Sequence, residues 1–301
     1  MRNSYLNVNA RTLIAPEFVA VRCFFRRSGM IILRMVTGIA CRREDTCLKT
    51  GGDIVPSELI EQNPALDGLP DAYSDWRQSA LGQITDALEQ RLLLDRIGPA
   101  EGLDILDVGC GDGVLATKLA ASGAQVTGLD ASAEMITAAR CRASAAKVDL
   151  NLVAGDAGSL PFSAARFDVV ISVATLCFSA SPQQPIREMA RVLKLGGRLI
   201  LGELGGWNAW AVQRRVKGWL GSSIWRAARF RSRKELITLA DGADLRDATI
   251  TGAIFYPPLG AAARLMAPID ARIGRWTPVG AAFLVLTATK SSAPDSVSNP
   301  E

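Results

Sequence analysis

The chain of 301 residues contains no histidine, so the commonest general base in enzymes is absent. Its six cysteines include no C-x-x-C pair and no spacing typical of metal ligands. We therefore expect reduced thiols in a cytoplasmic protein, and no metal site. No apolar run of 18 residues is free of charge, so a membrane-spanning helix is not expected.

Acidic residues are scarce at the amino terminus, where residues 1–43 hold eight arginines and Glu17 as the single acid. We expect residues 1–50 to form a basic extension without a fixed fold, outside a domain spanning residues 51–290. The extension resembles an organellar transit peptide, but it would also fit an upstream extension of the reading frame. Residues 291–301 show no apolar periodicity and are expected to be a disordered tail. The net charge of +4 does not by itself imply a nucleic-acid partner.

A glycine loop is the most informative feature that is present. An apolar run beginning at Leu103 enters a loop with Gly109, Gly111 and Gly113, and residues 114–122 have helical apolar spacing. Glycine lets the backbone approach a ligand, and a helix start presents unpaired N–H groups. In the dinucleotide fingerprint G-x-G-x-x-G the third glycine comes one residue later. A tight turn that binds no ligand is the alternative interpretation.

Further strands are predicted along the chain, and their continuous hydrophobicity is typical of a parallel sheet that is buried on both faces. An acid, Asp130, ends the second strand, where doubly wound folds hold ribose hydroxyls and where its charge would repel a 2′-phosphate. We therefore do not expect NADP. The predicted strands after the first are residues 125–129, 150–154, 166–172, 198–204, 248–256 and 281–290.

Five segments in order, L-D-V-G-C-G-D-G, L-D-A-S, G-D-A-G-S-L-P-F, F-D-V-V-I-S and R-V-L-K-L-G-G, resemble the type 11 family of class I S-adenosylmethionine-dependent methyltransferases. The resemblance covers about residues 71–290. It implies an α/β fold, with a seven-stranded, doubly wound, mostly parallel Rossmann-like sheet and a helical cap at residues 205–235. It also implies methyl transfer from S-adenosyl-L-methionine. An NAD-dependent oxidoreductase and a non-catalytic cofactor-binding scaffold are the alternatives.

The resemblance assigns roles to individual residues. Asp107 would support the loop whose glycines line the methionine half of the cofactor, and Asp130 would accept the ribose hydroxyls beside Ala131. Met135 would cover the adenine, unless it is an ordinary core residue. The adenine amine would meet Asp156 and the Ala157 N–H, whereas Asp130 and Asp156 could instead serve as a helix cap or a turn. Ser172 and Val173 would lie next to the methyl group.

Four of the six tryptophans, at 207, 210, 219 and 225, lie in the expected cap, where no acid occurs between Leu204 and Lys234. By spacing, Trp207, Trp210 and Arg214 share a helical face. Such a segment can bind a small acceptor or lie on an acidic membrane, and RNA is the least expected partner. An ordinary packing helix is the plain alternative. We expect a small, partly apolar methyl acceptor, with peripheral membrane contact through the cap left open.

Candidates for a general base are few. Glu203 ends the fifth predicted strand, and Tyr73 and Tyr256 flank the same region, but each is a weak candidate. In-line displacement at a carbon activated by a sulfonium can proceed largely by alignment. The sequence does not indicate the acceptor atom, the use of a base or the oligomeric state.

Overall fold

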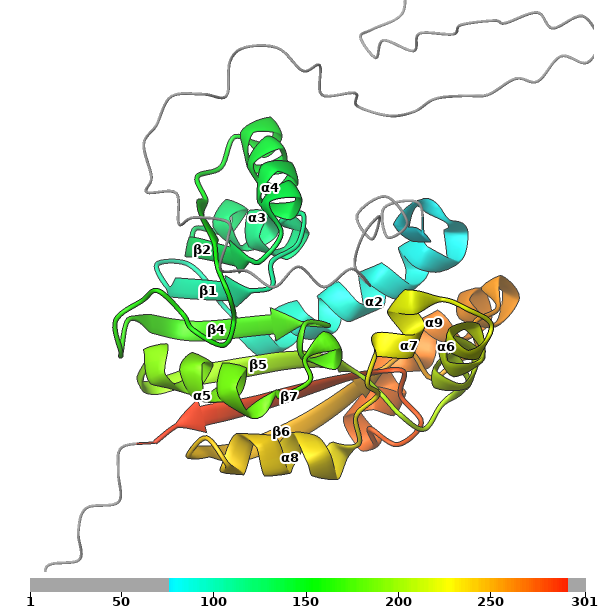
Figure 1. Ribbon diagram of the computed structural model, residues 1–301. Helices are drawn as coiled ribbons and strands as arrows, with labels where there is room; N and C mark the ends of the chain where they lie inside the picture. Colours follow the sequence, from blue (N-terminus) through cyan, green and yellow to red (C-terminus); the bar gives the residue numbers. More distant parts are fainter. Residues whose placement is uncertain (1–75, 292–301) are drawn as a thin grey trace, which may run out of the picture. The chain divides into compact units, whose positions relative to one another are not determined.

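The centre of the molecule is a seven-stranded sheet in the order β3-β2-β1-β4-β5-β7-β6 (Figure 1). The computed structural model describes residues 76–291. The strands are β1 Asp104–Val108, β2 Gln125–Asp130, β3 Asn151–Ala154, β4 Phe167–Val173, β5 Leu193–Leu204, β6 Leu245–Ala253 and β7 Phe283–Lys290. Tyr73, the predicted extension at residues 1–50 and the tail beyond Ser291 lie outside the described residues.

Strands β1 to β5 pair in parallel, and β7 is antiparallel to both of its neighbours. The prediction of a mostly parallel, doubly wound sheet is therefore confirmed. The strand order reverses direction between β1 and β4, which lie side by side in the sheet. Ligands of such sheets bind at the carboxyl ends of the strands beside this switch point.

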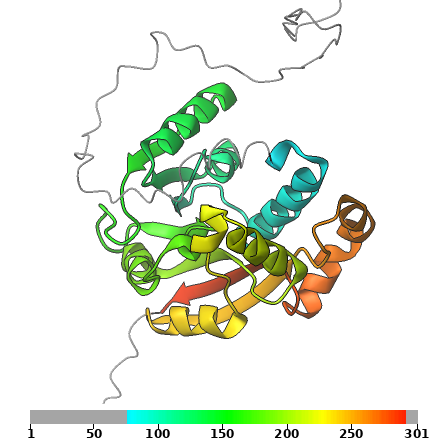
Figure 2. The same ribbon diagram turned by 45° about the vertical axis from the view of Figure 1, so that its right-hand side comes forward.

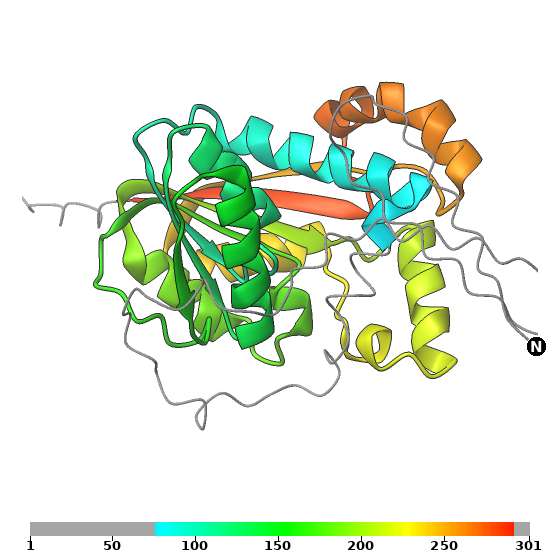
Figure 3. The same cartoon turned by 90° about the horizontal axis from the view of Figure 1, so that it is seen from above.

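Helices cover both faces of the sheet (Figure 3). One core cluster joins the sheet to α2, α3 and α9, and the other joins it to α5 and α8. The helices are α2 Ala80–Ile97, α3 Val114–Ala121, α4 Ala133–Ala146, the 3-10 turn η3 Leu176–Phe178, α5 Gln183–Val192, α6 Ala209–Trp219, α7 Ser223–Ala227, α8 Arg233–Asp241 and α9 Gly260–Trp276. Within residues 76–291, no helix combines the length and apolar character needed to cross a membrane.

The cap consists of α6 and α7, which pack on each other beyond the end of β5 (Figure 2). The prediction that Trp207 and Trp210 share a helical face is wrong. Asn208 caps α6, its side chain accepting the Ala211 N–H at 2.8 Å, so Trp207 precedes the helix. Trp207 is 85% exposed, whereas Trp210 is 4% exposed.

Strand β6 ends at Ala253, three residues before its predicted end at Tyr256. The buried carboxylate of Asp270 on α9 accepts the N–H groups of Ile254 and Phe255, each at 2.9 Å. Ile254 adopts a φ of +67°, which is rare for a β-branched residue and breaks the extended backbone. These two hydrogen bonds fix the start of the loop that leads into α9.

Candidate functional site

The loop after β1 is held against the end of β2. The N–H groups of Gly109 and Cys110 both donate to the carbonyl of Leu129, at 2.7 and 3.0 Å. Gly111 has a φ of +55°, and a Cβ placed there would meet nothing within 4 Å. The loop therefore leaves the backbone at Gly111 open to close approach by a ligand. Gly113 serves packing, because a Cβ there would lie 2.8 Å from the Ala139 Cβ of α4.

Asp130 is central to this edge of the sheet. Its Oδ2 accepts the Gly111 N–H at 2.8 Å and its Oδ1 accepts the Ser132 N–H at 2.9 Å. Burial raises the pKa of this carboxyl, and these N–H donors oppose the rise. A carboxylate offers about four acceptor positions, so two remain for hydroxyl donors. The carbonyl of Asp130 also accepts the Gly155 N–H at 3.0 Å, which joins the loops after β2 and β3.

Asp107 lies beneath the glycine loop and is 3% exposed. Burial, together with the charge of Asp130, raises its pKa to about 7. No donor among residues 76–291 forms a hydrogen bond with the carboxylate of Asp107. A buried carboxylate without a donor favours a cationic partner, and this matches the ammonium group of an amino-acid ligand.

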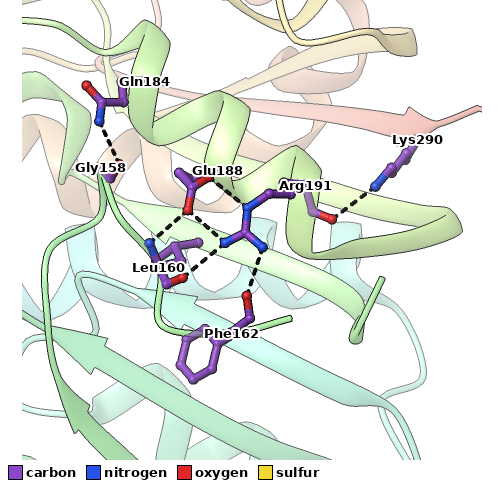
Figure 4. Close-up of polar contacts among 7 residues, drawn as sticks. All are labelled: Gly158, Leu160, Phe162, Gln184, Glu188, Arg191 and Lys290. Carbon is purple, nitrogen blue, oxygen red and sulfur yellow. Dashed lines mark hydrogen bonds and ion pairs between the residues drawn. The ribbon is translucent and has the colours of Figure 1, made fainter. Parts of the chain in front are cut away.

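The loop that carries Asp156 and Ala157 is fixed from α5. Asp156 is exposed, and its Oδ1 accepts the Gly158 N–H at 2.9 Å. Gln184 Nε2 then donates to the carbonyl of Gly158 at 2.8 Å, and Glu188 Oε2 accepts the Leu160 N–H at 2.9 Å (Figure 4).

Arg191 completes this anchor. Its guanidinium donates to the carbonyl oxygens of Leu160 and Phe162, at 3.0 and 2.8 Å, while it pairs with Glu188 at 2.8 Å (Figure 4). The Lys290 ammonium caps the arrangement by donating to the Arg191 carbonyl at 3.1 Å. The loop is thus positioned before any ligand binds, which lowers the entropic cost of binding.

Met135 lies in the first turn of α4, where the predicted N-cap Ser132 accepts its N–H at 3.2 Å. Its side chain is only partly buried, and it belongs to neither core cluster formed by the described residues. The next residue, Ile136, takes the buried position instead. Along the chain, Met135 follows Asp130 and the exposed Ala131 at the end of β2.

The tip of β4 faces the glycine loop. Ser172 is fully buried, and its hydroxyl donates to the carbonyl of Val108 at 2.9 Å. Its hydroxyl is therefore engaged within the sheet, whereas Val173 is partly exposed. A Cβ at Gly109 would lie 2.1 Å from Thr175 Oγ1, so this glycine gives the loops after β1 and β4 room to meet.

Glu203, at the end of β5, is fully buried. Its Oε1 accepts the Leu176 N–H at 3.2 Å, while Arg231 Nη2 donates to the Leu176 carbonyl at 3.2 Å. Burial raises the pKa of Glu203 to about 8, against the opposing effect of Arg231. The two side chains clamp the η3 turn that follows β4.

Tyr256 is held between α2 and α6. It is 2% exposed, and its hydroxyl is 3.1 Å from Thr85 Oγ1 on α2. Its carbonyl accepts the indole N–H of Trp210 at 2.8 Å, and the two rings pack edge to face. Burial raises the pKa of Tyr256.

The cap is built around a cation–π stack. The guanidinium carbon of Arg214 lies 5.3 Å from the Trp210 ring centroid and 4.9 Å from that of Trp225. Part of the aromatic and basic character noted in the sequence is therefore internal packing that joins α6 to α7.

Sequence reasoning missed the role of Asp112, the acid between the second and third glycines. Its carboxylate forms ion pairs with Arg77, just before α2, and with Arg142 of α4, the latter at 2.6 Å. Arg142 Nε also donates to the Asp112 carbonyl at 2.8 Å. The pairs fix the glycine loop from two helical segments. They join residues 35 and 30 positions apart, which no local pattern indicates.

Comparison of the sequence with known proteins indicates one family. The family model for the methyltransferase domain matches residues 106–201. The ubiquinone biosynthesis O-methyltransferase of Idiomarina loihiensis is 33% identical over 168 residues, which cover 53% of this chain and 68% of that protein. The protein of the same name from Coxiella burnetii (strain Dugway 5J108-111) is 30% identical over 226 residues, covering 68% of this chain and 91% of that protein.

Solved structures share the fold. A crystal structure from Thermotoga maritima, described as an SAM-dependent methyltransferase and possible histamine N-methyltransferase, has a TM-score of 0.59 at 21% identity, covering 75% of this chain and 98% of that one. Geranyl diphosphate C-methyltransferase of Streptomyces coelicolor was solved with S-adenosyl-L-homocysteine. It has a TM-score of 0.51 at 18% identity, covering 67% of this chain and 78% of that one. An NAD-dependent oxidoreductase is not favoured by these relatives. The chain belongs to the methyltransferase-domain family and is an S-adenosylmethionine-dependent methyltransferase.

Proposed function

We propose that this enzyme methylates a small, partly apolar acceptor. The main support for this proposal is the position of the cap: α6 and α7 follow β5 at the sheet edge where the glycine loop opens. The stack of Trp210, Arg214 and Trp225 gives that cap an aromatic frame. The relatives named as ubiquinone biosynthesis O-methyltransferases support an acceptor of this class and favour oxygen as the methylated atom.

We propose that the methionine half of the cofactor binds at the glycine loop. Gly109, Gly111 and Gly113 would line it, with the open backbone at Gly111 giving the closest approach. The buried carboxylate of Asp107 would face the ammonium group. The backbone of Ser172 and Val173, at the tip of β4, would border the methyl group.

The adenosine half would lie across the loops after β2 and β3. Two acceptor positions of Asp130 remain for the ribose hydroxyls, beside Ala131. Met135, which no core cluster takes up, would cover one face of the adenine. Asp156 and the Ala157 N–H, on the loop held by Arg191, would meet its polar edge.

Methyl transfer would rest on alignment rather than on a general base. S-adenosylmethionine supplies a methyl group that its sulfonium already activates. Approximation of two reactants contributes roughly 7–11 kcal/mol in well-oriented systems. The three weak base candidates gain no support: Glu203 is buried and holds Leu176, Tyr256 pairs with Thr85, and Tyr73 lies outside the described residues.

The test is a product screen with methyl-labelled S-adenosylmethionine. We would incubate the full chain with phenolic acceptors of increasing alkyl length, with RNA and with a protein extract, and use Asp130→Ala as the matched control. Label in an organic-extractable small molecule that depends on Asp130 is expected. Label confined to RNA or protein would contradict the proposed acceptor class.

We further propose a cytoplasmic location and a folded domain spanning residues 51–290. Among the described residues, the buried cysteines Cys110 and Cys177 are free thiols, which supports a reducing compartment. Fractionation of the source cells and limited proteolysis of the full chain test the two proposals.

A further inference from the structure

Large apolar side chains are exposed on one face of α6. Val212, Val216, Trp219 and Leu220 recur at helical spacing, and both Trp219 and Leu220 are 82% exposed. The opposite face of the helix buries Trp210, Ala211 and Gly218. The exposed stripe therefore adds nothing to the core, although exposing it to water is unfavourable.

A second stripe lies on α9, about 50 residues further along the chain. Leu265, Ile269 and Trp276 share one face, with Trp276 91% exposed, while Ala263, Asp270 and Gly274 are buried. Among the described residues, every exposed large hydrophobic residue except Leu195 lies in the segments 207–220 and 259–279. Such concentration marks an interaction surface, whereas single exposed apolar residues do not.

The exposed charged side chains of α6, α7 and α9 are all basic. Lys217, Arg226 and Arg229 are exposed beside the α6 stripe, in a stretch without an acid. Arg264, Arg272 and Arg275 are exposed on α9. The only acid of α9, Asp270, is buried and accepts two backbone N–H groups. The surface therefore complements an anionic partner.

Both stripes lie at the edge of the sheet that carries the site. Strands β5 and β6 are each antiparallel to β7, so they run in the same direction and end at the same edge. Helix α6 follows β5 and α9 follows β6, and Figures 1 and 2 show both helices at that end. An acceptor entering beneath the cap would approach from this side.

We propose that the α6 and α9 stripes dock the enzyme on the surface of an anionic phospholipid bilayer, from which it takes an acceptor that partitions into lipid. Exposed tryptophan and leucine within a basic surface is the composition of interfacial helices. The identity of the acceptor rests on the proposed function, but the docking does not. A second copy of the chain is a poorer occupant, because two basic faces would meet. Residues 44–75, which hold eight acids and one lysine, are the competing occupant within the chain.

The test is sedimentation of the full chain with vesicles of phosphatidylcholine, with or without phosphatidylglycerol. Binding to the anionic vesicles at least about tenfold tighter than to the neutral ones is expected. Trp219→Ser with Leu220→Ser, and separately Leu265→Ser with Ile269→Ser, should each weaken that binding at least about tenfold. Leu195→Ser, an exposed residue at the opposite edge, should leave it unchanged.

Charge is tested with Lys217→Gln and Arg226→Gln together, against Arg140→Gln and Arg187→Gln, which remove the same charge from α4 and α5. Only the first pair should weaken binding. Calorimetry with S-adenosylhomocysteine on every variant separates docking from folding and from the proposed function. Vesicle binding that is absent, or unaltered by both serine pairs, overturns the proposal. The proposal is also overturned if light scattering shows that the wild-type chain is a dimer and that the serine pairs convert it to a monomer.

Discussion

The carboxylate of Asp107 is buried beside a second carboxylate, and both features disfavour its charge. A pKa of about 7 places its titration within the physiological range. A cationic ligand group beside it would favour the ionised form. In the proposed role, Asp107 would couple its own protonation to the binding of an amino-acid ligand.

We predict that S-adenosylhomocysteine binds more weakly as pH falls through 7. In the free protein Asp107 takes up a proton below its pKa of about 7, and binding next to the ammonium must release it. Linkage then gives roughly eightfold weaker affinity at pH 6 than at pH 7.5. Calorimetry across this range measures the effect, and Asp107→Asn should flatten it. A wild-type affinity that does not change with pH would contradict the role given to Asp107.

Gly111 and Gly102 form a matched pair. Each has a positive φ, and a Cβ at either position would meet nothing within 4 Å. Alanine should therefore cost each variant a similar free energy of unfolding, about 1–2 kcal/mol for left-handed backbone. Only Gly111→Ala should lose affinity for S-adenosylhomocysteine, because Gly102 precedes β1. Equal affinities in the two variants, measured by calorimetry, would remove Gly111 from the cofactor site.

At the scale of elements, the η3 turn depends on a buried carboxyl that accepts one N–H. We predict that Glu203→Gln retains this hydrogen bond and lowers turnover by less than about a hundredfold, the low end for a general base. Single-turnover methyl transfer gives the rate. A thousandfold loss with unchanged S-adenosylhomocysteine affinity would instead identify Glu203 as the base.

The same variant carries a stability prediction. The pKa of Glu203 is about 8 in the folded protein, above the ordinary value of 4.5 for a glutamate, so ionisation of this carboxyl opposes folding. The stability that the protonated carboxyl contributes is present at low pH and is lost as pH rises through 8. Glu203→Gln should therefore raise the Tm of the ligand-free protein at pH 8.5 and leave it nearly unchanged at pH 5.5. An unchanged Tm at both values would show that the carboxyl is not destabilising when ionised.

Local pattern was sufficient to locate β1 to β4 and the end of β5, because each contains a short run rich in apolar residues. The prediction began β5 at residue 198, whereas the strand begins at Leu193. Local pattern was not sufficient where residues distant in the sequence determine where an element ends. Strand β6 stops early because Asp270, 16 residues later, takes the Ile254 N–H. Trp207 precedes the N-cap residue Asn208, so it lies outside the helix that contains Trp210. The spacing of the two tryptophans does not reveal where that helix begins.

The candidate site shows the same division. The glycine loop, Asp130 and Asp156 were predicted as candidate residues, since their order along the chain matches a family pattern. Their supports were not found: Arg191 reaches Leu160 and Phe162 across about 30 positions, and Arg77 reaches Asp112 across 35. Contacts of this range arise from the topology of the sheet, which no local period encodes.

At the scale of the whole molecule, the described residues 76–291 already contain all seven strands and both core clusters. We predict that deleting residues 1–50 and 291–301 leaves the Tm and the affinity for S-adenosylhomocysteine unchanged, because neither segment has a pattern that could join the core. Differential scanning calorimetry and ligand titration measure both. A Tm many degrees lower in the shortened chain would show that the basic extension stabilises the domain.

The central claim is that the loops at the carboxyl ends of β1, β2 and β3 bind S-adenosylmethionine through Asp130. Titration of S-adenosylhomocysteine into the wild-type chain and into Asp130→Ala tests it most directly, with NAD as the competing ligand. We predict binding of S-adenosylhomocysteine but not of NAD. The variant should lose roughly 1.5–3 kcal/mol, the scale of hydrogen bonds to a charged group. Unchanged affinity in a folded Asp130→Ala variant, or preferential binding of NAD, would contradict the account.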